Sequence, residues 1–386
     1  MKIVDLFCGC GGMSLGFAKA GFDIVAGFEN WDAAYTCYNA NFNNRCIKMD
    51  LSNVDSVVEE LKKLSPQIII GGPPCQDFSL AGDQVEGARA NLTYSFAEII
   101  SKYKPSYFVM ENVQQVVESQ AYMRAKQLLI ESGYGITERV LDASFCGVPQ
   151  KRKRFFCIGG LGKENDFLSI ALSAEQSIFP LTIREYLNTS NKTFGINYYY
   201  RHPRTYGRRA IFSIDEPSPT IRGVNRPKPS NYKKHDGDPV PPTNIRALTY
   251  LERACIQTFP DNYIWDSSVS VSEQMIGNAV PVNLALHVAT ALKNYISNKV
   301  DINSVSFVDW LMNTKHLCSR AASDVLSRAN RARRIKKFSN FKCENYLTEL
   351  SDDPIFQKLN RSTQSELRRA VILYFHYKEI RRERNV

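Results

Sequence analysis

A cysteine and a glutamate each follow a short apolar run, and their positions suggest covalent chemistry. Cys75 comes after the apolar residues 68–70 and a Gly-Gly-Pro-Pro turn, and Glu111 directly follows the apolar residues 107–110. Such runs predict buried parallel strands, and the carboxyl ends of neighbouring parallel strands share one crevice. The two prolines restrict the backbone before Cys75. We therefore expect a nucleophilic thiol on a stiff turn beside a carboxyl group that exchanges protons.

The first strands of the chain decide between this hypothesis and the alternative that Cys75 is a small buried hydrophobe in a turn. The apolar residues 3–7 run into a glycine-rich loop and a helical pattern. Glu29 closes the next strand, twenty residues beyond Gly9, where an acid can accept ribose hydroxyls. Asp50 closes a third strand and suits an adenine amino group. Three ordered strand ends predict a site for an adenosyl cofactor.

Five segments, in order, resemble the signature motifs of the cytosine-C5 DNA methyltransferase family over roughly the first three hundred residues. They are residues 5–12 (DLFCGCGG), 72–76 (GPPCQ), 111–113 (ENV), 150–154 (QKRKR) and 277–280 (GNAV). The resemblance implies an α/β fold with a doubly wound, mostly parallel sheet, the Rossmann-like fold of methyltransferases that use S-adenosyl-L-methionine. A small target-recognition lobe and a C-terminal helical extension would complete it.

The resemblance also implies a mechanism. Cys75 would add to C6 of a cytosine flipped out of duplex DNA, and Glu111 would supply a proton at N3. Arg152 and Arg154, which alternate along an extended segment, would contact the cytosine carbonyl oxygen and hold Glu111. C5 would then take the methyl group from S-adenosyl-L-methionine. No metal is expected in this reaction.

By the same resemblance, a larger set of residues would surround the methyl donor. A loop that begins near Cys75 would close over the base, and Leu92 at its end would border the cofactor. The candidate cofactor-binding residues are Phe7, Gly9, Gly11, Gly12, Glu29, Asn30, Asp50, Leu51, Pro74, Leu92, Asn278 and Val280.

The net charge of +10 is unevenly distributed along the chain. Residues 195–235 hold nine Lys and Arg against two Asp and Glu, and residues 301–386 hold seventeen against ten. The first segment interleaves tyrosines with arginines and would read a short duplex site of roughly 4–6 base pairs. A basic loop with only nonspecific affinity is the alternative. The candidate DNA-binding residues are Gln76, Ser79, Arg89, Tyr200, Arg201, Arg204, Arg208, Arg209 and Arg222.

These patterns predict three parts: a catalytic and cofactor-binding domain of residues 1–165 completed by 270–300, a target-recognition lobe of 166–269, and a basic helical extension of 301–386. In the extension, Thr363 and Glu366 can form a capping box, and Pro354 marks a break between helices. The extension could widen the DNA footprint, bind a partner nuclease or cap the catalytic lobe.

Composition places the protein in a reducing compartment. The ten cysteines show no Cys-x-x-Cys pairs, which argues for reduced thiols. No apolar run approaches transmembrane length. We expect a cytoplasmic monomer without membrane contact. The resemblance suggests a restriction-modification system with a companion restriction endonuclease, although a solitary methylase would share these features. A tRNA cytosine-C5 methyltransferase and a non-catalytic DNA-binding regulator remain alternatives.

Overall fold

The computed structural model describes residues 1–74, 91–174, 176–177, 179–203, 205, 207–297, 302–337 and 342–383. The chain divides into two compact units. One comprises residues 1–165 and 179–290, and the other comprises residues 166–178 and 291–386.

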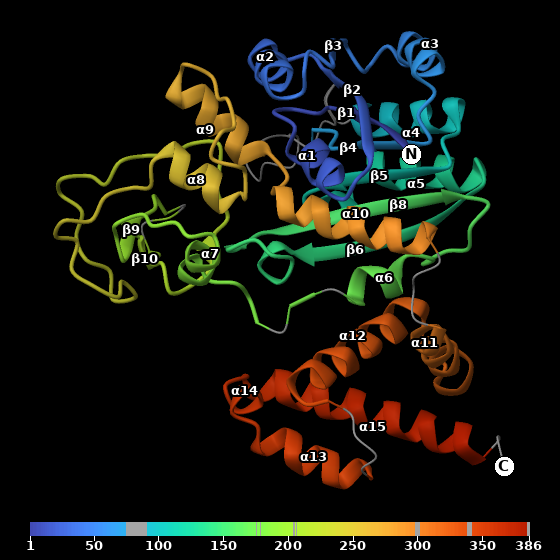
Figure 1. Cartoon of the computed structure of the whole chain (residues 1–386). Helices are drawn as coiled ribbons and strands as arrows, with labels where there is room; N and C mark the ends of the chain where they lie inside the picture. The colour runs from blue at the N-terminus through green and yellow to red at the C-terminus, as the bar shows by residue number, and fades with distance from the viewer. Residues whose placement is uncertain are drawn as a thin grey trace. The chain divides into compact units, whose positions relative to one another are not determined.

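A seven-stranded sheet forms the centre of the first unit, in the order β3-β2-β1-β4-β5-β8-β6 (Figure 1). Every neighbouring pair is parallel except those of β8, which runs antiparallel to both β5 and β6. The predicted doubly wound, mostly parallel sheet is therefore confirmed. The strands are β1 (Lys2–Leu6), β2 (Asp23–Glu29), β3 (Cys46–Lys48), β4 (Ile68–Gly71), β5 (Tyr107–Asn112), β6 (Tyr134–Asp142) and β8 (Lys153–Leu161).

Helices on the two faces of the sheet explain why its central strands are apolar without alternation. Ile68, Ile69 and Ile70 of β4 are all fully buried, as expected for a parallel strand covered on both sides. The helices of this part of the unit are α1 (Gly12–Lys19), α2 (Asp32–Asn41), α3 (Val54–Leu64), α4 (Asn91–Tyr103), α5 (Gln120–Glu131) and the first part of α10 (Val282–Ile296).

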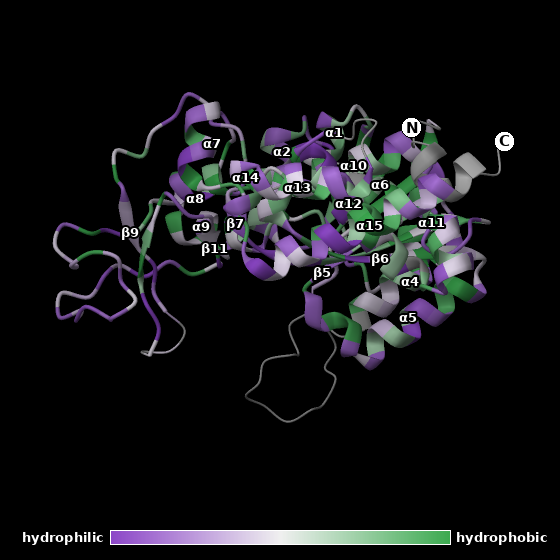
Figure 2. Ribbon diagram, turned by 90° about the horizontal axis from the view of Figure 1, so that it is seen from below, coloured by the Kyte–Doolittle hydropathy of each residue, from purple (hydrophilic) through white to green (hydrophobic). Residues whose placement is uncertain are grey.

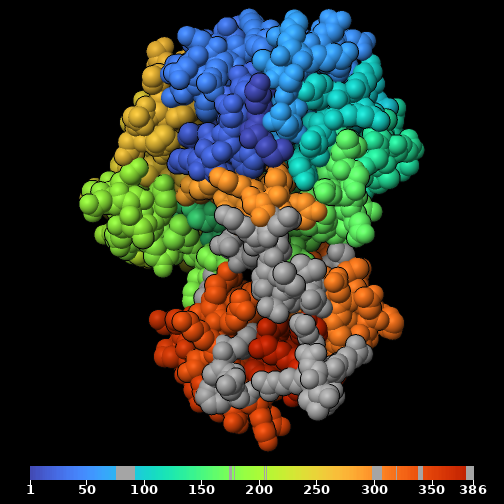
Figure 3. Space-filling view, turned by 45° about the vertical axis from the view of Figure 1, so that its right-hand side comes forward, coloured from blue at the N-terminus to red at the C-terminus, as the bar shows by residue number. Residues whose placement is uncertain are grey.

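Helix α10 brings a late part of the sequence back to the first helix. A Cβ atom at Gly16 of α1 would lie 2.5 Å from the Cβ of Ala285 and 2.6 Å from the carbonyl oxygen of Val282. Only glycine allows this close approach of two helices. Figure 3 shows the blue N-terminal residues and the orange α10 side by side. The end of the family-like region therefore packs directly behind the glycine-rich loop.

The segment that follows the sheet is mostly irregular and belongs to the same compact unit. It contains α7 (Ile183–Thr189), the antiparallel pair β9 (Tyr198–Tyr200) and β10 (Ile211–Ser213), α8 (Tyr250–Ile256) and α9 (Val269–Asn278). A two-residue strand, β11 (Ser218–Pro219), pairs with β7 (Gln150–Lys151) ahead of β8. Figure 2 colours the loops around β9 mostly as hydrophilic. The predicted target-recognition lobe, residues 166–269, overlaps this segment and stays a prediction, and its first residues, 166–178, belong to the other compact unit. We call residues 179–269 the recognition segment.

The second unit is helical and has its own core. It consists of α6 (Ser169–Ala174), the end of α10, α11 (Ile302–Lys315), α12 (Ser319–Ile335), α13 (Cys343–Asp352), α14 (Pro354–Gln357) and α15 (Arg361–Glu383). Phe307, Leu311, Leu326, Ala370 and Tyr377 are buried in one cluster. The predicted break at Pro354 is confirmed, because α14 begins there.

The predicted capping box at Thr363 is wrong, because α15 begins two residues earlier. The side chain of Asn360 accepts a hydrogen bond from the Thr363 backbone amide at 2.8 Å, so asparagine takes the capping role.

One apolar helical stretch in the described part of the chain, Val269–Ile296, would be long enough to cross a membrane. However, 72% of its most apolar window is buried within the protein.

Candidate active site

A cavity of about 680 Å³ lies at the carboxyl ends of β1, β4 and β5. Ten of the predicted site residues line it, and they come from every motif that the sequence singled out. They are Phe7, Gly9, Gly12, Glu29, Pro74, Glu111, Arg152, Arg154, Asn278 and Val280. The strand-end crevice predicted from the apolar runs is thus present, and it joins the glycine-rich loop to the last motif.

The predicted nucleophile, Cys75, lies outside the described residues, as do Gln76, Ser79, Arg89 and Arg204. The turn that leads into Cys75 is described as far as Pro74. Asn112 at the end of β5 donates a hydrogen bond from Nδ2 to the carbonyl oxygen of Pro73 at 3.1 Å. This bond fixes the proline turn to the strand end that carries Glu111, and Pro74 lines the cavity.

Glu111 is buried beside two arginines. Its Oε1 atom lies 2.9 Å from Nε of Arg154, and both side chains are largely shielded from solvent. Burial raises the pKa of Glu111 above its ordinary value, although the positive charges of Arg154 and Arg152 act in the opposite direction. The carboxyl group therefore holds a proton more readily than an exposed glutamate does, which suits a proton donor.

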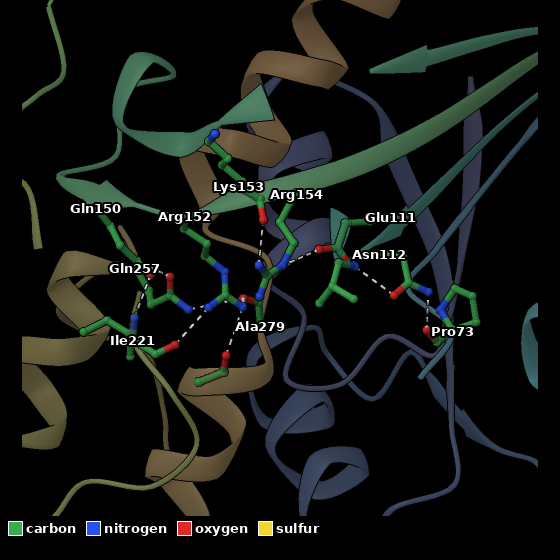
Figure 4. A network of polar contacts seen from close by, with 12 residues as sticks. Pro73, Glu111, Asn112, Gln150, Arg152, Lys153, Arg154, Ile221, Gln257 and Ala279 are labelled. Atoms are coloured by element: carbon green, nitrogen blue, oxygen red, sulfur yellow. Dashed lines mark hydrogen bonds and ion pairs between the residues drawn. The ribbon is translucent and has the colours of Figure 1, made fainter. Parts of the chain in front are cut away.

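Arg152 uses its guanidinium differently from Arg154, as Figure 4 shows. It is almost fully buried and donates from Nη1 to the carbonyl oxygen of Ile221 at 2.9 Å. Its Nη2 donates to the carbonyl oxygens of Gly277 at 2.9 Å and Ala279 at 3.0 Å. Burial lowers the pKa of Arg152 well below its usual range. Arg152 thus fastens the recognition segment and the last motif to the start of β8, while Arg154 holds Glu111.

Two glutamines extend this network. Gln150 donates from Nε2 to Oε1 of Gln257 at 2.7 Å and accepts the Ile221 amide at 2.8 Å. Gln257 in turn donates to the carbonyl oxygens of Ile276 and Ala279. The side chains of Gln150, Gln257 and Arg152 are all buried, and together they connect three segments that are distant in the sequence (Figure 4).

Where the glycine-rich loop lines the cavity, backbone amides orient the carboxylate of Glu29. Oε2 accepts the Gly9 amide at 2.8 Å, and Oε1 accepts the amides of Asn30 and Trp31, both at 2.9 Å. Phe7 and Gly9 both have positive φ, at 58° and 54°, so the loop turns sharply at the end of β1. Trp31, which the sequence analysis missed, also lines the cavity.

Five other predicted cofactor residues are not among the residues that line the cavity. Gly11 is the N-cap of α1 and Leu51 is buried in the core, so both have packing roles here. Asp50 is exposed and accepts the Ser52 amide at 2.9 Å. Asn30 is exposed beside Glu29, and Leu92 lies in the first turn of α4.

Asp5 is a second buried acid that the candidate set omitted. It is 1% exposed and lines the cavity from β1. Ser14 donates its hydroxyl to Oδ2 of Asp5 at 2.6 Å and lies 2.9 Å from the hydroxyl of Tyr38. Burial raises the pKa of Asp5 from 3.8 to about 7. A lone acid within the apolar run 3–7 is the sequence signal that would have found it.

A second, smaller cavity of about 320 Å³ lies in the recognition segment. Tyr200, Arg201 and Arg222 line it together with His202 and Arg226. Burial and the two nearby arginines, Arg226 and Arg222, lower the pKa of His202. This hollow is therefore basic and aromatic.

The predicted DNA-binding residues of this segment are only partly brought together. The Tyr200 side chain is buried and contacts Nδ1 of His202 at 3.1 Å. Arg209 pairs with Glu216 and stacks over the Phe212 ring at 4.3 Å. Arg208 is exposed, and neither Arg208 nor Arg209 lines the cavity.

The order of the strands, with one antiparallel strand between β5 and β6, and the cavity at the carboxyl edge define a Rossmann-like methyltransferase. The C-5 cytosine-specific DNA methylase family model matches residues 1–294, and the chain belongs to this family. The protein is thus a DNA cytosine-C5 methyltransferase, and DNA and a methyl donor are its substrates.

Similar proteins extend over the same part of the chain. The Type II methyltransferase M.HindV of Haemophilus influenzae is 52% identical over 298 residues, which are 76% of this chain and 97% of that protein. M.HgiDI of Herpetosiphon aurantiacus is 50% identical over 298 residues, 77% of this chain and 96% of that protein.

Solved structures share the fold at low identity. The S. pombe Dnmt2 methyltransferase has a TM-score of 0.57 at 19% identity and covers 78% of this chain and all of its own. The Spodoptera frugiperda DNMT2 mutant has a TM-score of 0.55 at 18% identity and covers 76% of this chain and 99% of its own.

Proposed function

We propose that the protein transfers the methyl group of S-adenosyl-L-methionine to C5 of a flipped-out cytosine in a short duplex sequence, through a covalent bond between Cys75 and C6. The observation that carries this proposal is the convergence at one cavity of Glu111, its partner Arg154 and the fixed turn that ends at Pro74. The residue after Pro74 is Cys75.

C5 of cytosine is too weak a nucleophile to attack a methyl sulfonium unaided. Addition of the Cys75 sulfur to C6 forms a carbon–sulfur bond and moves an electron pair through the ring to N3, which takes a proton from Glu111. The electron-rich C5 then accepts the methyl group. Return of the N3 proton to Glu111 and loss of the C5 proton to a base restore the ring double bonds and expel the thiolate.

The arginines have separate roles in this proposal. Arg154 orients Glu111 and moderates its raised pKa, so that the carboxyl group can both give and recover a proton near neutral pH. Arg152, whose guanidinium donates to three backbone carbonyls, acts as a positioning residue.

The cavity fits S-adenosyl-L-methionine by size and chemistry. Its volume lies in the range of small-molecule sites. Glu29, already oriented by three amides, would accept the ribose hydroxyls, and Phe7 and Trp31 would contact the adenosyl group. Asp50 would reach the adenine amino group. When bound, this donor supplies an electrophilic methyl group.

The biological setting follows from the relatives. M.HindV and M.HgiDI are named Type II methyltransferases and are about half identical to this chain. We infer that this enzyme also acts in a restriction-modification system, as a cytoplasmic monomer, and protects host DNA from a companion restriction endonuclease. The basic and aromatic cavity of the recognition segment would contact the duplex.

The test is transfer of tritiated methyl groups to a mixed-sequence duplex and, in parallel, to tRNA, followed by mapping of the modified atom. We expect label at C5 of cytosine in the duplex only. Cys75→Ser should reduce transfer by roughly a thousandfold or more and leave donor binding intact. Cys318→Ser, which replaces an exposed cysteine of the second unit, is the matched control and should keep full activity.

Duplexes that contain 5-fluorocytosine give an independent readout, because fluorine cannot leave C5 as a proton does. The wild-type protein and the Cys318→Ser variant should form a stable covalent complex, and Cys75→Ser should not. Label on an exocyclic amine, or on tRNA alone, would refute the proposal, and absence of transfer to any nucleic acid would favour a regulator.

A further inference from the structure

Most of the helical unit lies beyond the part of the chain that the methyltransferase family model matches. The family model ends at residue 294, and the match to 76% of this chain accounts for 97% of M.HindV. The unit buries its own apolar cluster, which includes Phe307, Leu326 and Ala370. A function separate from the catalytic fold therefore has to explain it.

Its positive charge is concentrated on helix α12. This helix carries five arginines and one aspartate between Ser319 and Ile335, and five of the seven residues 331–337 are Lys or Arg. Cations at a helix C-terminus are favoured by the helix dipole, but the dipole acts only on the last turn. Arg320 and Arg328 lie well before that turn.

Three arginines lie along one side of α12. Arg328, Arg331 and Arg334 follow one another at intervals of three residues, which places them along one side of the helix. Nε of Arg328 lies 3.2 Å from Oε2 of Glu366 on α15. Arg331 is close enough to Arg334 and Glu366 for both to affect its pKa, which burial and the charge of Arg334 lower. Arg328 and Arg331 thus both lie near Glu366, and Arg334 lies near Arg331, so positive charge gathers on this side of the helix.

More cations are exposed on the same unit. Arg333, Arg334, Lys337 and Arg369 are all exposed, and the last lies on α15, three residues beyond Glu366. Guanidinium groups bind phosphate oxygens in a forked geometry. The surface formed by α12 and α15 therefore offers several phosphate-binding groups.

The exposed apolar residues of the unit argue against a protein partner. Among its described residues, the large exposed apolar side chains are Met312, Ile355 and Ile372, and each lies on a different helix. A protein interface generally needs a contiguous apolar or aromatic core, and backbone contacts to nucleic acid do not.

We propose that the helical unit binds the sugar–phosphate backbone of duplex DNA, in addition to the phosphates that the catalytic unit contacts. The proposal rests on the proposed function only in taking duplex DNA as the substrate. A second binding module on the same chain raises the effective concentration of the duplex at the catalytic unit. The binding is independent of sequence, because phosphates carry no sequence information.

The test uses the full chain with Arg333, Arg334, Lys337 and Arg369 changed to Gln, and measures binding to a duplex of about 40 base pairs over a range of salt concentrations. Each lost phosphate contact reduces the slope of log K against log salt by about 0.9. We expect the slope to fall by roughly 2 to 4 and the affinity at low salt to fall at least tenfold. The methylation rate with saturating DNA should not change.

The matched control neutralises four exposed lysines of the catalytic unit, Lys2, Lys62, Lys104 and Lys163. Lys2 and Lys104 lie at or just before the amino ends of β1 and β5, Lys62 lies in the last turn of α3 ahead of β4, and Lys163 lies just after β8. These positions are at the sheet edge opposite the cavity. This variant should keep the wild-type salt slope. A variant with Lys in place of Arg333, Arg334 and Arg369 should keep most of the slope, because the charge remains.

An unchanged slope in the Gln variant, with methylation intact, would overturn the proposal, and so would equal loss of slope in the Lys variant. If the Gln variant instead loses binding to an acidic protein and not to DNA, the unit is a protein-binding module. Failure of the wild-type protein to methylate DNA that it binds would refute the proposed function and leave this inference standing.

Discussion

Two buried acids of different character share one cavity. Asp5 and Glu111 both have raised pKa values because burial disfavours their charged forms. Glu111 faces a guanidinium, whereas Asp5 faces the neutral hydroxyl of Ser14. Glu111 can therefore lose and regain a proton next to a compensating cation, whereas the Asp5 carboxylate is stabilised by hydrogen bonds to Ser14.

Asp5→Asn should change how stability depends on pH. Because the folded pKa of Asp5 is about 7 and its ordinary value is 3.8, the folded state binds more protons between these values. The wild-type protein should thus lose free energy of unfolding as the pH rises from 4 to 7, on the order of 4 kcal/mol from this group. Urea titrations at pH 5 and pH 8 should show a smaller loss in the variant.

Asn keeps an oxygen for the Ser14 hydroxyl, so the comparison isolates the ionisation. Ser52→Ala, at an exposed position outside the cavity, is a control that should follow the wild-type pH dependence. A variant that loses as much stability with rising pH as the wild-type protein would show that Asp5 does not titrate in this range.

Glu111→Gln should lower kcat by about 10² to 10⁴-fold, the usual contribution of a positioned proton donor. Gln preserves the shape of the side chain but cannot give a proton to N3. Donor binding, measured by calorimetry, should stay within about twofold of wild type. If single-turnover methylation proceeds at the normal rate, Glu111 is not the proton donor.

Arg152 connects the start of β8 to the segments around Ile221 and Gly277, and we expect its loss to destabilise the fold. Arg152→Met would leave the carbonyls of Ile221, Gly277 and Ala279 without their donor. Loss of buried hydrogen bonds to a charged donor should cost about 3 kcal/mol or more in free energy of unfolding. Chemical denaturation and methylation kinetics measure the two effects.

Arg154→Met is the matched comparison, because its guanidinium pairs with Glu111. It should reduce kcat strongly and shift its pH dependence, since the pKa of Glu111 rises further without Arg154. Equal stability losses in both variants, with the same kinetics, would contradict the separate roles of the two arginines.

The sequence predicted the position of a site residue where the residues next to it reveal a strand end. Glu29 and Glu111 follow apolar strands, and both line the cavity. The partners of Arg152 were not predictable, because they are backbone carbonyls 69, 125 and 127 residues away, which leave no trace in side-chain identity. The burial of Tyr200, which stays a predicted DNA contact, was likewise not visible in the sequence.

At the scale of the whole molecule, two compact units with separate cores should unfold separately. Leu326 is 1% exposed in the core of the helical unit. Leu326→Ala should lower the free energy of unfolding of that unit by about 2 to 5 kcal/mol. Scanning calorimetry should show one transition shifted to lower temperature and the other unchanged.

Methylation of a short duplex should survive this substitution, because Leu326 lies beyond residue 294, where the match to the methylase family ends. Ile69→Ala, in the centre of the sheet, is the reciprocal control and should shift the other transition. A single transition that moves in both variants would mean that the units unfold cooperatively.

The charge of the two basic segments was readable from the sequence, and so was the buried face of α15. Leu367, Ala370, Val371, Tyr374 and Tyr377 recur at helical spacing in the sequence, which predicts one buried face. Tyr374 is half-buried, and the other four are buried. The separate core of the helical unit was not predictable, because residues 166–178, which belong to it, lie more than a hundred residues before the rest.

The hydrogen bonds from Arg152 to main-chain oxygens have an evolutionary consequence. Hydrogen bonds to backbone carbonyl oxygens do not depend on the side chains of the segment that supplies those oxygens. Residues around Ile221 can therefore change without loss of the hydrogen bond that holds this segment to Arg152. If related enzymes exchange this segment, its attachment to the sheet should be preserved wherever Gln150 and Arg152 are kept.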